Sequence, residues 1–185
     1  MPLATLFHRA SLPSPQVSEA QALQWLAEHY GISGRLKALG SQQDLNFRVD
    51  SERGRFVLKI CRGDYSLVEL QAQHAGLKSL AEHSAVRVPS VIVANNGQDL
   101  LTLESAGESV HVRLLDYIEG QPLTDLDHLG KEVVAGFGRL CGEMDLALAG
   151  FDHPGLERTL QWDARHASAL IRHLLPVIKD QRQRA

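Results

Sequence analysis

The start of the chain shows a helical pattern of apolar and polar positions. Four apolar residues fall on one face of a helix: Ala22, Leu23, Trp25 and Leu26. Ser18 is a typical N-cap residue, Gln21 three positions later completes a capping box, and Gly31 suits the C-terminal end. The pattern predicts a short amphipathic helix that follows an N-terminal arm over residues 1–17.

Runs rich in Phe and Val follow this helix. Residues 45–49 and 55–60 predict two strands, and the polar segment 50–54, which ends in glycine, predicts the hairpin loop between them. Residues 36–39 form a third short run that can pair with these two. We therefore expect three antiparallel strands in this part of the chain.

A second helix and further strands are predicted downstream. Leucines at helical spacing predict a helix over 67–82. Residues 91–93 and 100–103 predict two strands, which the Asn-Asn-Gly turn at 95–97 would join as a hairpin. Apolar residues alternating with His and Arg predict one more strand over 110–117.

Beyond Pro122 the pattern is helical only. Residues 126–148 and 162–178 predict two helices, with an Asp-His-Pro-Gly segment at 152–155 between them. Strands that come first and helices that come afterwards predict an α+β fold, with the later helices segregated at one end.

The composition is that of a globular chain. Hydrophobic residues make up 44% and charged residues 22%, and the net charge of -3 gives no general attraction to nucleic acid or an anionic membrane. No stretch approaches the roughly 20 apolar residues of a membrane span, and the N-terminus lacks a signal-peptide pattern. Two distant cysteines, Cys61 and Cys141, favour free thiols in a reducing compartment. We expect a cytoplasmic protein without nucleic-acid or membrane partners.

Most kinds of catalytic chemistry find no motif here. Nine histidines suggest a metal site, but none stands in a spacing such as His-Glu-x-x-His, and no cysteine has a Cys-x-x-Cys partner. A Gly-x-Ser-x-Gly nucleophile motif is also missing. The sequence predicts no metal ligands and no nucleophile.

Phosphate binding is better supported. Lys59 lies in an apolar strand, where a lysine alone is usually just a surface residue. Glu69 follows in the next predicted helix, and a lysine held by a helix carboxylate is how kinases bind the α- and β-phosphates. The loop 40–46 can direct backbone N–H groups at phosphate oxygens, and the segment 115–120 can present backbone groups to adenine.

Several short segments add a resemblance that runs from about residue 18 to residue 175. They are 43–49, 56–60, 68–71, 112–122, 137–140, 144–148, 151–154 and 162–163. In their order and spacing the chain resembles the aminoglycoside phosphotransferase-like small-molecule kinases, most closely the hydroxylysine kinase group. The resemblance implies a protein-kinase-like N-lobe over 18–116, made of an antiparallel sheet plus helix, a hinge over 117–122 and an incomplete helical C-lobe over 123–185.

The resemblance also implies a nucleotide site for ATP or GTP with Mg²⁺. Its residues would be Ser41, Gln42, Asn46, Lys59, Glu69, Leu115, Asp116 and Ile118. Lys59 would contact the phosphates and pair with Glu69, and residues 41–46 would cover the phosphates. Asp116 and Ile118 would bind adenine through backbone groups, with the leucine before them behind the adenine pocket.

One element of such kinases is missing. No His-x-Asp motif followed by asparagine occurs, and no asparagine follows Asn96. The catalytic base and the metal ligands are therefore expected outside these 185 residues. We expect an ATP-dependent kinase of a small hydroxyl-bearing metabolite such as hydroxylysine, represented by its nucleotide-binding half, which alone would be inactive.

Two other interpretations stay open. The chain can be an inactive nucleotide-binding or partner-docking module, whose apolar residues after Pro122 support self-association: Phe137, Leu140, Met144, Leu148, Leu170 and Leu174. It can also be an unrelated α+β domain in which Lys59 and Glu69 form an ordinary ion pair and no nucleotide binds.

Overall fold

The computed structural model describes residues 14–41, 43–158 and 163–179. The chain divides into two compact units, of which one spans Ser14–Leu156 and the other combines Met1–Pro13 with Glu157–Ala185. Most of the predicted N-terminal arm lies outside the described residues, as does the first residue of the helix predicted over 162–178.

The first helix, α2, spans Glu19–Tyr30 as predicted. The Ser18 hydroxyl accepts a hydrogen bond from the Gln21 N–H at 3.2 Å, and Gly31 ends the helix with φ of 63°, a conformation that glycine adopts without strain. The predicted capping box is only half made, because the Gln21 side-chain oxygen accepts from the Ser105 hydroxyl at 2.9 Å.

Six strands form one antiparallel sheet in the order β1-β2-β3-β6-β4, with β5 also paired to β6. The strands are β1 (Gly34–Leu39), β2 (Leu45–Ser51), β3 (Gly54–Arg62), β4 (Val91–Ile92), β5 (Leu101–Ser105) and β6 (Glu108–Asp116). The three strands predicted over 36–60 and the strand predicted over 110–117 are thereby confirmed.

The predicted hairpin between β4 and β5 is wrong. The Asn-Asn-Gly turn does form, with the Gly97 N–H donating to the Ala94 carbonyl at 2.9 Å. Both strands pair with β6, however: β4 with Leu114 and Leu115, and β5 with residues 108–112. Because β3 pairs with one edge of β6, β4 and β5 pair one after the other with its second edge. The segment that contains the turn connects β4 to β5 without pairing them to each other.

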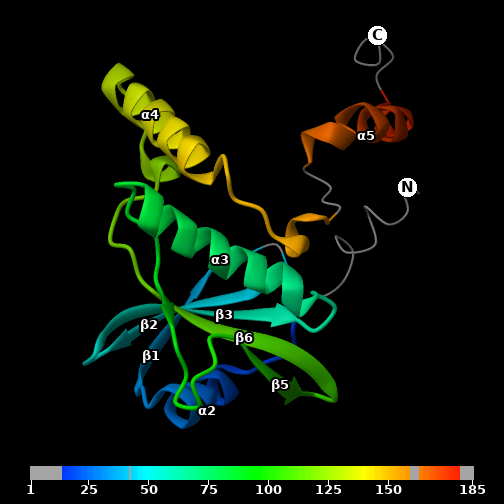
Figure 1. The fold of residues 1–185 in the computed structure, drawn as a ribbon. Helices are drawn as coiled ribbons and strands as arrows, with labels where there is room; N and C mark the ends of the chain where they lie inside the picture. The colour runs from blue at the N-terminus through cyan, green and yellow to red at the C-terminus, as the bar shows by residue number, and fades with distance from the viewer. Residues whose placement is uncertain (1–13, 42, 159–162, 180–185) are drawn as a thin grey trace. The chain divides into compact units, whose positions relative to one another are not determined.

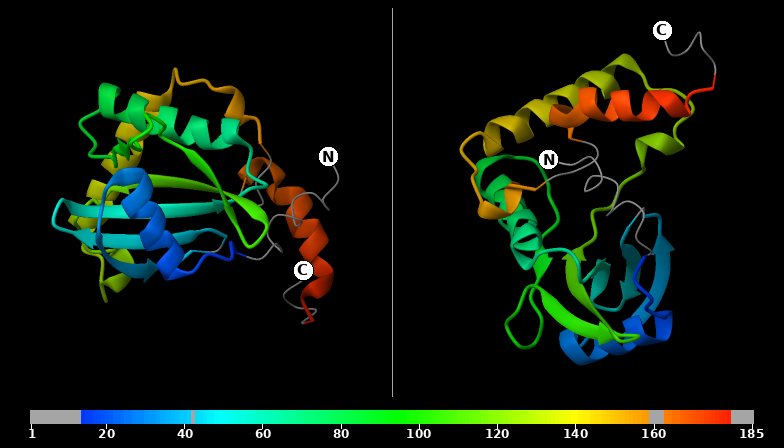
Figure 2. Two further views of the ribbon diagram at one scale, coloured as in Figure 1. Left: turned by 90° about the horizontal axis from the view of Figure 1, so that it is seen from below. Right: turned by 90° about the vertical axis from the view of Figure 1, so that its right-hand side faces the viewer.

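Different helices cover the two faces of the sheet (Figure 1). Helix α2 crosses the strands on one face, as Figure 2 shows from below, and contributes to the main hydrophobic core. That core joins residues of α2 to alternate residues of the strands: Ala22, Trp25, Leu26, Tyr30, Phe47, Val49, Leu58, Ile60, Val110, Val112 and Leu114. Helix α3 (Leu67–His83) lies on the opposite face.

Helices dominate beyond Pro122, as predicted. After a 3₁₀ turn at Leu123–Asp125, α4 spans Lys131–Leu148, so it begins later than expected. A 3₁₀ turn at Pro154–Leu156 packs on α3 so closely that a side chain on Gly155 would collide with the Val68 carbonyl. In the second unit, α5 spans Ala167–Leu174 between 3₁₀ turns. Within the described ranges, no helix is long and apolar enough to cross a membrane.

Candidate functional site

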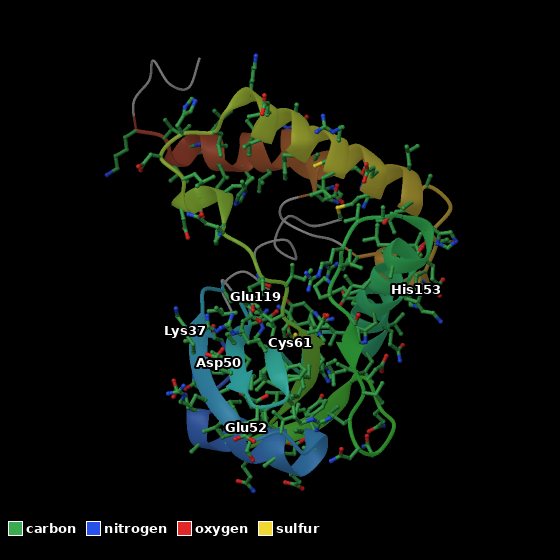
Figure 3. All side chains as sticks on the ribbon, turned by 90° about the vertical axis from the view of Figure 1, so that its left-hand side faces the viewer. Lys37, Asp50, Glu52, Cys61, Glu119 and His153 are labelled. Atoms are coloured by element: carbon green, nitrogen blue, oxygen red, sulfur yellow. The ribbon has the colours of Figure 1, made fainter. Side chains whose placement is uncertain are left out.

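The strand register defines a grid of side chains on the sheet face that α3 covers. Successive strand residues point to opposite faces, so positions two apart share a face, and paired residues on neighbouring strands lie side by side. Three rows cross β2, β3 and β6 outside the main core: Asn46–Lys59–Arg113, Arg48–Val57–Leu115 and Asp50–Arg55–Tyr117. We call this grid the polar face, and its inner, middle and outer rows follow that order. Figure 3 labels Asp50 on β2, Lys37 on the neighbouring strand β1 and Glu119 just beyond β6.

The inner row holds a partly buried cation. The Lys59 Nζ donates to the Asn46 Oδ1 at 2.8 Å and lies 3.9 Å from the Asp44 Oδ2. Burial lowers the pKa of Lys59, the Asp44 carboxylate opposes that shift, and the neighbouring Arg113 guanidinium adds to it. Two neighbouring cations with one close carboxylate make this row a favourable place for an anion.

The predicted pairing of Lys59 with Glu69 is not the one this structure makes. Glu69 lies in the first turn of α3, where its Oε2 accepts from the Ser66 N–H at 3.0 Å and its N–H donates to the Ser66 hydroxyl at 3.3 Å. This capping box holds the carboxylate at the helix terminus. The contact between α3 and the inner row is made instead by Arg113, whose Nη2 donates to the Gln73 Oε1 at 2.6 Å.

The loop between β1 and β2 lies at the inner end of the polar face. The Ser41 hydroxyl accepts from the Asp44 N–H at 3.1 Å, and Gln42 falls outside the described residues. Asn46 was predicted in this loop, but it belongs to β2, where pairing with Lys59 fixes it beside the ammonium. Within the described part of the chain, the buried Asp44 Oδ1 has no hydrogen-bond partner.

The segment predicted to bind adenine follows the middle row. Leu115 is 8% exposed and lies beside Val57, which makes an apolar surface between two polar rows. The Asp116 N–H donates to the Ser90 carbonyl at 3.0 Å, and the Asp116 carboxylate accepts from the Ser90 N–H. Ile118 is half-buried in the irregular segment after β6. Leu115 thus belongs to the middle row, which is the row next to that of Lys59, and Asp116 follows it directly on β6.

Sequence reasoning missed two arginines of the polar face. Arg113 is 3% exposed beside Lys59, and Arg48 has 26% of its side chain exposed beside Val57. The signal was present in β2, where polar residues at 46, 48 and 50 alternate with Phe47 and Val49. Such alternation in a strand with neighbours on both sides indicates a polar face.

The donor set does not fit a bound Mg²⁺ ion. Among the residues the structure describes, no group of three His, Cys, Asp or Glu side chains could hold a metal. Carboxylates are the protein ligands through which Mg²⁺ is usually bound. The polar face therefore combines the two cations of the inner row with the apolar pair Val57 and Leu115.

Comparison with known proteins shows the family of the chain. Residues 35–184 match the model of the phosphotransferase enzyme family. The chain belongs to this family. Hydroxylysine kinase of Mus musculus is 29% identical to the chain over 157 residues, which are 77% of this chain and 41% of that protein. The predicted resemblance is confirmed at the level of the phosphotransferase family.

Solved structures of small-molecule kinases share the fold of this phosphotransferase-family chain. A microcompartment-associated aminopropanol kinase matches with a TM-score of 0.64 at 24% identity, over 80% of this chain and 46% of its own. Amicoumacin kinase, solved with AMP-PNP and Ca²⁺, matches with a TM-score of 0.68 at 16% identity, over 90% of this chain and 49% of its own. The kinase-like α+β fold is confirmed, and the chain spans less than half the length of each of these relatives.

Proposed function

We propose that this phosphotransferase-family chain binds ATP, or GTP, on its polar face. The observation that carries the proposal is the partly buried Lys59 ammonium, which lies beside Arg113 and next to the apolar pair Val57 and Leu115. In the full-length enzyme the bound nucleotide would transfer its γ-phosphoryl group to the hydroxyl of a small metabolite such as hydroxylysine. Membership of the phosphotransferase family and the 29% identity to hydroxylysine kinase support this substrate class.

The chain's own part in this reaction is to bind and orient the nucleotide. Lys59 would contact the phosphates from the inner row, under the loop that carries Ser41 and Gln42, while Glu69 holds the first turn of α3 beside them. The base would lie on the middle row against Leu115, near the backbone of residues 116–118. Phosphoryl transfer depends mainly on such positioning and on electrostatic stabilisation. Residues 18–116 would be the N-lobe, 117–122 the hinge and 123–185 part of the C-lobe.

The chemical step would need groups that these residues do not supply. The sequence has no His-x-Asp motif with a following asparagine, so it offers neither the base nor the metal-binding asparagine of such kinases. Mg²⁺, bound elsewhere in the full-length enzyme, would offset phosphate charge. The 185 residues alone are expected to turn over negligibly. A reducing cytoplasm would suit the two free cysteines, Cys61 and Cys141.

Calorimetric titration of the 185-residue chain with Mg-ATP tests the proposal. Lys59→Met should weaken binding at least about tenfold, since a hydrogen bond to a charged group is worth about 1.5–3 kcal/mol. Lys37→Met is the matched control, because it removes an exposed lysine of β1 and should leave the affinity within about twofold. Absence of binding by the folded wild type, or equal affinity in the Lys59 variant, would overturn nucleotide binding.

A coupled assay for ADP release tests the proposed inactivity separately. Phosphorylation of hydroxylysine by this chain, lost in Lys59→Met, would show that the residues carry a catalytic base after all. Background turnover in both proteins is the expected result.

A second candidate function is docking or self-association through α4. None of the α4 residues is buried among the described residues, and Phe137 is 54% exposed and Leu146 79% exposed. Apolar side chains gathered on one helix favour an interface. Sedimentation velocity over a range of concentrations should then show a dimer that Phe137→Ser weakens. A monomer at every concentration would remove this candidate.

A further inference from the structure

We propose that Arg48 stacks on the nucleobase and supplies most of the base-dependent part of nucleotide affinity. The inference rests on the proposed nucleotide binding at the polar face and adds a base-recognition residue to it. Arg48 has a position, an orientation and a set of partners that together favour this role over phosphate binding.

The position of Arg48 follows from the register. Arg48 pairs with Val57, which pairs with Leu115, so these three side chains form the middle row. Asn46 and Lys59 form the row before it, two residues away along each strand, which is about 7 Å at 3.3 Å per residue. A nucleotide with its phosphates on Lys59 would therefore place its ribose and base over the middle row.

The orientation of Arg48 brings its guanidinium toward Asp50 and Tyr117, at the outer side of that row. The Arg48 Cζ lies 5.9 Å from the centre of the Tyr117 ring, although β3 separates β2 from the segment after β6. The Arg48 guanidinium bonds to Asp50 on its own strand, so Arg48 and Tyr117 approach each other from β2 and from the segment after β6. The guanidinium consequently lies between the middle and outer rows, next to the strand against which the base would pack.

The partners of Arg48 fix one edge of its guanidinium and set the group beside the Tyr117 ring. Its Nε and Nη2 both donate to the Asp50 Oδ2, at 3.2 Å and 2.7 Å, and the Asp50 Oδ1 lies 3.3 Å from the Arg55 Nε. Arg48, Asp50 and Arg55 also line an open hollow of about 1020 Å³, which extends toward the turn between β2 and β3 and not over Val57 and Leu115. A planar cation held by one edge is suited to stack on an aromatic ring, as the approach of Arg48 to Tyr117 illustrates, and every nucleobase presents such a ring.

The experiment compares ATP with inorganic tripolyphosphate, which has the phosphates but no base. Wild type, Arg48→Met, Arg48→Lys and Lys37→Met are each titrated as the full 185-residue chain at one salt concentration. Arg48→Met should weaken ATP binding about tenfold, because stacking of one base contributes about 1–3 kcal/mol, and tripolyphosphate affinity should change less than twofold. Arg48→Lys keeps the charge but loses the planar group, so it should behave like Arg48→Met.

Lys37→Met controls for charge alone, because Lys37 pairs with Arg48 across β1 and β2 and faces the same side of the sheet. Both ligands should bind this variant as they bind wild type. Equal weakening of both ligands in Arg48→Met, with rescue by Arg48→Lys, would assign Arg48 to phosphate and overturn the inference. Equal affinity of the wild type for ATP and tripolyphosphate would overturn it without any variant.

Failure of the proposed function gives a different result. If folded wild type binds neither ligand, nucleotide binding and the role of Arg48 are both overturned. If wild type binds ATP in a way that depends on Lys59 but not on Arg48, only the inference about Arg48 is overturned. Far-UV circular dichroism and the thermal unfolding midpoint of each variant show whether a lost affinity reflects a lost fold.

Discussion

The sheet and helix α4 both carry apolar side chains, but the sheet buries those on one face whereas α4 leaves its own exposed. On the core face of the sheet, Leu58, Ile60 and Val112 are all 0% exposed, because α2 covers them. On α4, Phe137 is 54% exposed and Leu146 is 79% exposed. An apolar stripe therefore predicts a surface that can be buried, and the rest of the fold decides whether it is covered.

This difference determines where the stability of the chain comes from. Full burial of a large apolar side chain contributes about 1.5–3 kcal/mol to the free energy of unfolding, and many side chains of the sheet are buried in this way. Helix α4 contacts α3 but has no buried residue among those described, so it depends more on its own backbone hydrogen bonds, and most helix stability in proteins comes from tertiary packing. We expect α4 to open more readily than the sheet.

The largest expected effect separates the two cysteines. Burial, with a smaller effect of the Asp44 carboxylate, raises the pKa of Cys61 on β3 to about 12, so at pH 8 only about one thiol in 10,000 would be ionised. Cys141 is exposed on α4. In the folded chain Cys141 should react with an aromatic disulfide reagent at least about a thousandfold faster than Cys61, which a two-phase absorbance trace would show.

Two controls make the thiol measurement specific. Cys141→Ser should remove the fast phase and leave the slow one, and both cysteines should react at once in guanidinium chloride. A single fast phase for both thiols in the folded protein would mean that β3 is far more accessible than its burial indicates, and the contrast between sheet and helix would fail.

Truncation of one leucine in each region gives the next largest effect. Leu58→Ala should lower the free energy of unfolding by about 2–5 kcal/mol, because Leu58 is fully buried and leaves a cavity. Leu140→Ala on α4 should lower it by less than about 1 kcal/mol, because that side chain is already 39% exposed. Urea unfolding of both variants measures the pair. Similar losses would show that α4 is covered in solution, as self-association would require.

The sequence predicted those features that local chemistry controls. Ser18 and Gly31 bound α2 because capping and a left-handed glycine depend only on neighbouring residues. Runs rich in Phe and Val predicted β2 and β3, because such residues favour strands. Lys59 was identified as a candidate not from the lysine alone but from its order along the chain relative to the loop 40–46, Glu69 and the segment 115–120.

Features that depend on distant residues were predicted less well. The Asn-Asn-Gly turn before β5 suggested a hairpin, but both flanking strands found their partner in β6. The partner of Lys59 was also wrong, because the Ser66 capping box held Glu69 and cross-strand pairing set Asn46 beside the ammonium. Arg48 was missed because its importance depends on which residues lie beside it on β3 and β6.

The smallest expected effect compares the N-termini of α3 and α4. Ser66 caps α3 with its hydroxyl, so Ser66→Ala should cost about 1 kcal/mol of unfolding free energy, measured as a lower urea midpoint. Gly130 caps α4 without a side-chain hydrogen bond and in an extended conformation that serine also adopts. Gly130→Ser should therefore stabilise α4, but only by a few tenths of a kcal/mol.

The Ser66 variant also tests how Glu69 is used. Ser66→Ala removes the hydroxyl that accepts from the Glu69 N–H but leaves the carboxylate of Glu69 in place. ATP affinity should then stay within about twofold of wild type while stability falls. A loss of ATP affinity as large as that of Lys59→Met would mean that the capping box positions the nucleotide site itself, and the order of the first turn of α3 would then be a functional property.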